Sequence, residues 1–137
     1  MASRLTTFGL NSMARAFTQA SGYSASRFAR TLAIDDSSVG FAAGDDALND
    51  GGAVANEFDV AFDATPSAPS AGAVTMVATV PAASGILVHR RASWHDDTVT
   101  NVTTSSTTLL MGVDGFALTK TGDFSMSYTG VVQLATV

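Results

Sequence analysis

Apolar and polar side chains alternate over several short stretches of this chain. Near the C-terminus, Phe124, Met126 and Tyr128 occupy alternate positions and polar residues stand between them. This period of two is typical of a strand that buries one face and exposes the other. We therefore expect the three large side chains to face a core. The polar positions expected to face solvent are Asp123, Ser125, Ser127 and Thr129.

The same pattern, bounded by turn-forming residues, predicts further short strands along the chain. The expected strands are Arg27–Ile34, Glu57–Asp63, Val74–Val80, Ile86–Trp94, Thr98–Thr104, Thr107–Val113, Phe116–Lys120 and Asp123–Val137, the last with a break considered at Gly130. Turns are expected at Asp35-Asp36 and at residues 95–97, and residues 40–53 form a Gly- and Asp-rich loop.

One helix is predicted before the strands. Thr6 or Thr7 can cap a helix over about residues 7–19, and Ser21-Gly22 can end it. At 100° per residue, one apolar stripe forms on this helix, while Arg4 and Arg15 point the other way. The stripe consists of Leu10, Met13, Ala14 and Phe17.

These elements predict an all-β fold: an antiparallel β-sandwich or jelly roll of about seven to eight strands with one short N-terminal helix. A length of 137 residues suits a single domain. Within it we distinguish residues 1–25, a helix with a basic arm, from residues 26–137, the β-body.

Charge is unevenly distributed along the chain. Residues 1–34 contain four arginines (Arg4, Arg15, Arg27 and Arg30) and no acidic residue, a charge of +4. The remaining residues carry all 12 acidic residues against three basic ones, a charge of −9, and the net charge is −5. An acidic body disfavours direct nucleic-acid binding. The basic segment suits docking on an acidic surface, although four solvated arginines or a mitochondrial transit peptide would have the same composition.

The composition limits the kinds of site that this chain can form. The chain has no cysteine, so disulfides and thiolate metal sites are excluded. Charged residues make up 14% of the chain, below the usual share of about a quarter, and small residues take their place. Surfaces rich in small, weakly polar residues are common on proteins that pack against neighbours. We expect no membrane span, because no apolar run has the required length of about 18–20 residues, and no secretory signal peptide.

Candidate reactive residues are few. His89 and His95 are six apart, too far along a straight strand to ligate one metal, and no Gly-x-Ser-x-Gly motif accompanies the serines. The loop at Asp45 and Asp46 does not match the EF-hand ligand spacing. The remaining calcium-binding alternative for this loop is an irregular surface site. Trp94 continues an apolar row and suits a core or an edge better than a sugar platform. We therefore expect no catalytic residue, no metal and no cofactor.

Two segments stand out by their wording, LTTFGLNSM at residues 5–13 and LTKTGDFS at residues 118–125. They resemble segments of a family of small structural proteins of tailed-bacteriophage virions, often labelled tail-fibre-like. Leu5–Met13 (LTTFGLNSM) resembles the family's Leu-Thr-x-x-Gly-Leu-Asn opening, and Leu118–Ser125 (LTKTGDFS) resembles its closing Thr-Lys-Thr and alternating strand. The middle departs from the family, because Ser84–Val88 (SGILV) stands where a Glu-x-Gly-Leu-Phe segment is frequent.

The resemblance implies a non-enzymatic virion component, and we favour a capsid decoration (cement) protein on the capsid exterior. Its expected partners are the major capsid protein or other virion proteins and further copies of itself, with a trimer favoured. The candidate interaction residues are Arg4, Leu10, Met13, Arg15, Phe17, Arg27 and Arg30. The alternatives are a tail, baseplate or fibre-attachment subunit, a carbohydrate-binding β-sandwich and, last, an enzyme.

Overall fold

The computed structural model describes residues 2–18, 31–50, 52, 54–63, 73–96 and 108–133. Its helix is α1 (Thr7–Thr18). Its strands are β1 (Ala2–Leu5), β2 (Thr31–Asp35), β3 (Glu57–Ala61), β4 (Ala73–Val80), β5 (Val88–His89), β6 (Arg91–His95), β7 (Leu109–Asp114), β8 (Leu118–Thr119) and β9 (Met126–Gln133). The expected mostly-β chain with antiparallel sheets and one short N-terminal helix is confirmed.

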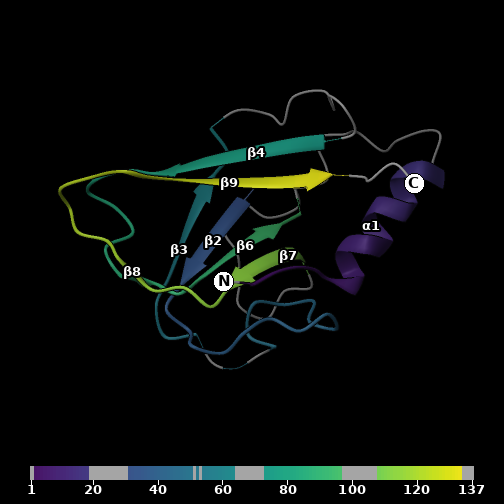
Figure 1. The fold of residues 1–137 in the computed structure, drawn as a ribbon, viewed down its shortest axis with the longest axis horizontal. Coiled ribbons are helices and arrows are strands. Elements are labelled where there is room, and N and C mark those ends of the chain that lie inside the picture. The colour runs from purple at the N-terminus through teal and green to yellow at the C-terminus, as the bar shows by residue number, and fades with distance from the viewer. Residues whose placement is uncertain are drawn as a thin grey trace.

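A five-stranded antiparallel sheet forms the base of the molecule, in the order β1-β7-β6-β2-β3. β2 and β6 are its central pair, and every residue of both strands is buried. β4 pairs with β9 in a separate two-stranded sheet, and β5 pairs with β8 in another. In Figure 1, β4 and β9 run together across the strands of the larger sheet, with α1 at one end and β8 at the other.

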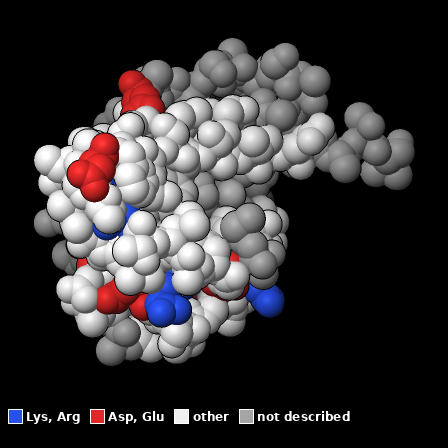
Figure 2. Space-filling model, turned by 60° about the vertical axis from the view of Figure 1, so that its left-hand side comes forward, with Lys and Arg blue, Asp and Glu red and all other residues white. Residues whose placement is uncertain are grey.

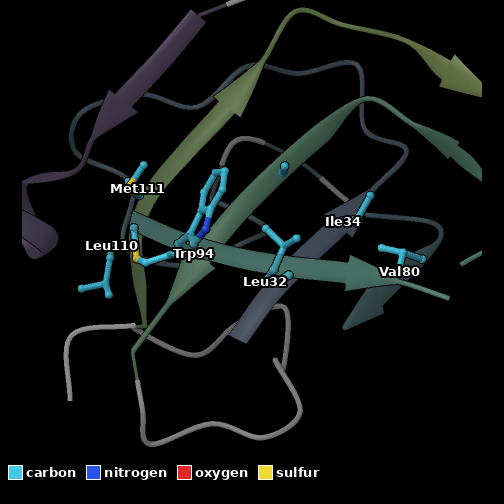
Figure 3. Close-up of a cluster of buried hydrophobic side chains, with 9 residues drawn as sticks. Leu32, Ile34, Val80, Trp94, Leu110 and Met111 are labelled. Atoms are coloured by element: carbon cyan, nitrogen blue, oxygen red, sulfur yellow. The ribbon is translucent and has the colours of Figure 1, made fainter. Parts of the chain in front are cut away.

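The main core lies between the five-stranded sheet and the β4–β9 sheet. It consists of Leu32, Ile34, Met76, Ala78, Val80, Ala92, Trp94, Leu110 and Met111. Trp94 points into this space beside Leu110 and Met111 (Figure 3). A Cβ on Gly130 of β9 would lie 2.7 Å from the Trp94 ring, so glycine lets β9 pass directly over the indole.

A β-bulge in β7 shapes both sides of the large sheet. Trp94 pairs with Met111, whereas His95 pairs with Leu109, so Leu110 is the extra residue. Because of this insertion, Leu110 and Met111 both join the main core. Leu109 joins a second cluster with Ala33, Phe41 and Leu48 on the opposite face, beneath the loop that follows β2.

The helix begins where the sequence places it and packs against β7. Thr6 caps it, because the Gly9 amide donates to Thr6 Oγ1 over 2.9 Å. The helix lies against β7 through Phe8 and Gly9, while Leu10 is 54% exposed and Ala14 is exposed. Of the predicted apolar stripe, Leu10 and Ala14 are therefore exposed, and Met13 is half-buried. A Cβ on Gly9 would clash with the Leu110 carbonyl oxygen, so close packing at this glycine sets the rotation of the helix.

Several strand boundaries also differ from the prediction. The expected strand Ile86–Trp94 is two strands, β5 and β6, which separate at Arg90. β9 begins at Met126 and continues through Gly130 without a break, so Phe124 lies in the preceding turn and is 43% exposed. Met126 and Tyr128 are half-buried, and Ser127 and Thr129 are exposed, as expected. The predicted strand Thr98–Thr104 lies outside the described residues.

Candidate functional site

The predicted N-terminal interaction residues are only partly described. Arg4 is exposed on β1, opposite Gly112 of β7. Leu10 is exposed and Met13 is half-buried on α1. The remaining four positions lie outside the described side chains: Arg15, Phe17, Arg27 and Arg30. The described part of the segment therefore presents one cation and one large apolar side chain to solvent.

This N-terminal segment is integrated in the sheet, because β1 pairs with β7 over its whole length. Between β1 and α1, the Thr6 amide donates to the Leu110 carbonyl over 3.0 Å. The Thr6 hydroxyl lies 2.7 Å from the Leu109 carbonyl oxygen and 2.9 Å from that of Leu110. These contacts hold the start of the helix on the bulge of β7.

His89 forms a buried pair with Tyr128. Its Nε2 lies 2.9 Å from the Gly85 carbonyl oxygen, which only accepts hydrogen bonds, so Nε2 carries the proton. Its Nδ1 then accepts from the Tyr128 hydroxyl over 2.5 Å. Burial lowers the pKa of His89 and raises the pKa of Tyr128 to about 12. This pair is a neutral link between β5 and β9.

His95 lies on the other face of the large sheet and is completely buried. Its Nε2 is 2.8 Å from Ser93 Oγ and its Nδ1 is 2.9 Å from Thr108 Oγ1. Burial lowers the pKa of His95 to about 3. Ser93 and His95 have the spacing of a nucleophile and base, but both side chains are 0% exposed, so a substrate has no access to them. They link β6 to the start of β7.

A buried ion pair joins Arg91 of β6 to Asp35 of β2. Arg91 Nε lies 2.9 and 3.1 Å from the two Asp35 carboxylate oxygens. The guanidinium also donates to the carbonyls of Val39 and Leu48, and it stacks 4.3 Å from the Phe41 ring centroid. Burial raises the pKa of Asp35, and the hydrogen bond from Arg91 opposes that rise. This cluster fixes the loop after β2 to the sheet.

Lys120 is also buried, next to the turn between β8 and β9. Its ammonium donates to the carbonyls of Ala82 and Thr121 over 2.8 and 3.2 Å. The Nζ atom lies 5.7 Å from the centroid of the Phe124 ring, a cation–π contact. Lys120 therefore joins the β4–β5 connection to the β8–β9 turn.

Two carboxyl groups stand two residues apart on the edge strand β3. The pKa of Glu57 is raised to about 8, first by burial and then by the hydrogen-bonded, negatively charged Asp59. Glu57 also lies opposite Asp35 in the sheet register. The pair retains a proton near neutral pH, an effect that the sequence pattern does not indicate.

The acidic loop after β2 uses its carboxylates to close turns. Asp45 Oδ2 accepts from the Ala42 amide over 2.7 Å. Asp50 Oδ2 accepts from the amides of Asp46 and Ala47 over 2.7 and 2.9 Å. Within the described residues, no three His, Asp or Glu side chains are grouped as metal ligands. These acids thus act as local caps.

A shallow depression of about 330 Å³ lies where β7 ends. It is lined by Ser37, Ser38, Val39, Arg90, Asp114, Gly115, Phe116 and Ala117. Asp114 Oδ2 accepts a hydrogen bond from the Phe41 amide over 2.7 Å, so one of its carboxylate oxygens is used in a contact within the fold. Arg90 gives the depression a cation, and the sequence pattern did not single out this residue.

Large apolar side chains are exposed at six described positions. They are Leu10, Val39, Ile86, Leu118, Phe124 and Val131. They are spread over α1, the loop after β2, the end of the molecule at β8, and β9. Trp94, by contrast, is 3% exposed and belongs to the core. Among the described residues, no helix is both long and apolar enough to cross a membrane.

Comparisons with family models, with curated proteins and with solved structures find no match for this chain.

Proposed function

We propose that this chain is a non-enzymatic structural protein of a tailed-phage virion, a capsid decoration protein on the capsid exterior. The observation that carries the proposal is that the buried polar side chains bond to other parts of the fold. The two histidines, Arg91, Asp35 and Lys120 are buried, and each hydrogen-bonds another element of the fold. Groups that would serve chemistry in an enzyme here hold strands and loops together, as a protein working by shape requires.

The resemblance at Leu5–Met13 and Leu118–Ser125 supports the virion role. The first segment forms the end of β1 and the start of α1, and the second forms β8 and the turn after it. At the level of fold, we propose that the five-stranded sheet and the β4–β9 sheet constitute a small antiparallel sandwich around the main core. Such a rigid body adds buried area where it bridges neighbouring capsid subunits.

Quantitative mass spectrometry of purified particles of the encoding phage tests this proposal. Hundreds of copies per particle support capsid decoration, whereas three to a few dozen copies support the alternative, a tail, baseplate or fibre-attachment subunit. Absence from the particle overturns both.

Docking through the N-terminal segment is tested with point substitutions. Deleting this segment would remove β1 and α1 from the fold, so a change in binding would be uninterpretable. Arg4→Glu combined with Leu10→Asp changes only exposed side chains. Val39→Asp, at another exposed apolar position, is the matched control. We expect lower capsid occupancy for the double variant alone, and equal occupancy for both proteins would contradict docking through this surface.

The carbohydrate-binding alternative predicted that Trp94 would be an exposed stacking platform. Trp94 instead lies beneath Gly130 of β9. A Trp94→Ala variant would therefore report on stability, and the alternative loses the aromatic residue on which it depended.

A further inference from the structure

The β4–β9 sheet has two strands, so each strand has an outer edge that no strand of the described residues covers. Its eight register pairs run without a bulge from Ala73 and Gln133 to Val80 and Met126. Unpaired strand edges are templates for pairing with another chain, and proteins usually protect them with charges, proline or bulges. The two outer edges of this sheet differ in such protection.

Asp63 blocks part of the outer edge of β4. The Asp63 amide donates to the Val77 carbonyl over 2.9 Å. Its carboxylate accepts from the Thr79 amide over 2.9 Å and from the Thr79 hydroxyl over 2.6 Å. A charged residue thus occupies two of the backbone groups that a new strand would need, the Val77 carbonyl and the Thr79 amide.

These contacts also identify the backbone groups on the open edge of β9. Because Val77 and Thr79 direct their backbone groups away from β9, they belong to the pairs that do not hydrogen-bond between the strands. Their partners in the register are Thr129 and Ser127, and Val131 follows in the same phase. The amides and carbonyls of Ser127, Thr129 and Val131 therefore point to the outer edge. Within the described part of the chain, these backbone groups have no hydrogen-bond partner.

The open edge carries none of the usual protective residues. Neither β4 nor β9 contains a charged residue, a histidine or a proline. The side chains beside the outward-facing amides are exposed and uncharged, and Val131 is 52% exposed. Figure 2 shows uncharged surface across the upper middle of one face of the molecule, with acidic residues at its left-hand end and further charged residues below it.

We propose that β9 is a self-association edge, at which β9 of a second copy pairs antiparallel to form a continuous sheet β4-β9-β9-β4. The argument for a second copy is electrostatic. Two chains of net charge −5 repel one another, and contact at an uncharged strand brings no like charges together. Antiparallel pairing of one strand with itself is also self-complementary under two-fold symmetry. The contact gives a dimer in place of the trimer favoured earlier, and it does not depend on a virion role.

The test uses two edge variants and one matched control. Val131→Lys places a charged side chain on the open edge, and Thr129→Pro removes an outward-facing amide while leaving the bonds to β4. Thr75→Lys is the control, because Thr75 pairs with Val131 on the exposed face but lies on β4, away from the proposed contact. Mass is measured by sedimentation equilibrium over a range of protein concentrations, with circular dichroism to confirm folding.

We expect a concentration-dependent dimer for the natural chain and for Thr75→Lys. Each edge variant should raise the dimer dissociation constant at least about tenfold. Hydrogen exchange adds a direct measurement: the amides of Ser127, Thr129 and Val131 should exchange more slowly as the dimer forms. A monomer at every concentration overturns the proposal. So does an oligomer that is insensitive to both edge variants, and so does exchange at these amides that is independent of concentration.

Discussion

Arg91 binds Asp35 within the sheet, with Nε 2.9 Å from one carboxylate oxygen and 3.1 Å from the other, and both side chains are at most 1% exposed. The two residues face each other in the register of β2 and β6. Since the same guanidinium reaches the carbonyls of Val39 and Leu48, one side chain joins two strands and a loop.

Arg91→Leu should lower the free energy of unfolding by about 3–5 kcal/mol, because it leaves Asp35 charged and buried without its partner. The neighbouring half-buried Arg90 supplies the control, and Arg90→Leu should cost less than about 1 kcal/mol. Urea denaturation measures both. The pair Asp35→Asn with Arg91→Leu should recover part of the loss, and a single Arg91→Leu variant as stable as the control would contradict this role.

Glu57 should make the protein less stable as pH rises. The folded chain keeps the Glu57 proton up to about pH 8, whereas the unfolded chain releases it near its ordinary pKa of 4.5. Between these values the folded state binds more protons, so the free energy of unfolding falls with increasing pH. With the partial exposure of this side chain taken into account, the loss is about 1–2 kcal/mol.

Glu57→Gln, which imitates the protonated acid, should remove this decline. Urea denaturation from pH 5 to pH 8 measures the effect. Asp123→Asn, at an exposed carboxyl, is the control and should leave the shape of the curve unchanged. A decline of equal size in the Gln variant would show that Glu57 is not its source.

His95 should make the protein less stable as pH falls, the opposite of the effect of Glu57. Its pKa is about 3 in the folded chain and 6.5 in the unfolded chain, so the unfolded state binds more protons between these values. Stability is fully present above pH 6.5 and falls by an amount on the order of 3–5 kcal/mol as pH drops toward 3. Between pH 4.5 and 6.5 this fall and the Glu57 contribution offset one another.

His95→Gln should flatten the acid limb of the stability curve while lowering overall stability by about 1–3 kcal/mol through altered hydrogen bonds. Nitrogen NMR of the natural chain provides a second measurement, in which the His95 ring should remain neutral at pH 5. An imidazole that titrates near pH 6.5 in the folded protein would contradict its burial.

Gly9→Ala should destabilise the protein although alanine is the better helix former. The intrinsic gain is about 1 kcal/mol. The added Cβ would clash with the Leu110 carbonyl oxygen and force the helix away from β7, at a cost of about 1–3 kcal/mol beyond that gain. Asn11→Ala, at an exposed position of the same helix, should instead stabilise by about 0.5 kcal/mol. Thermal unfolding compares the two variants, and a more stable Gly9→Ala protein would contradict the close contact.

The sequence pattern predicted individual strands and the start of the helix, which depend on residues close together in the chain. The alternation at residues 57–63 marks β3, and Thr6 marks the start of α1, because strand periodicity and capping are short-range effects. The buried side of the helix could not be predicted in this way. It depends on Gly9 meeting the Leu110 carbonyl, a contact between residues 101 positions apart.

The buried polar clusters were missed for a similar reason. Arg91 and Lys120 have the sequence pattern of solvated surface charges, and only the three-dimensional fold provides the carbonyls and the carboxylate that bind them. For Phe124 the error was the opposite one, because the pattern predicted a core position and the side chain is exposed. Its alternation with Met126 is regular, but the turn after β8 extends through it before β9 begins.

The pairing of β1 with β7 also constrains the order in which the chain folds during synthesis. β1 is synthesised more than 100 residues before its partner, Leu109–Asp114. Until then Phe8 and the cap of α1 lack the surface on which they pack. The large sheet therefore closes only after β7 has been synthesised, and contacts of such long range make folding slow.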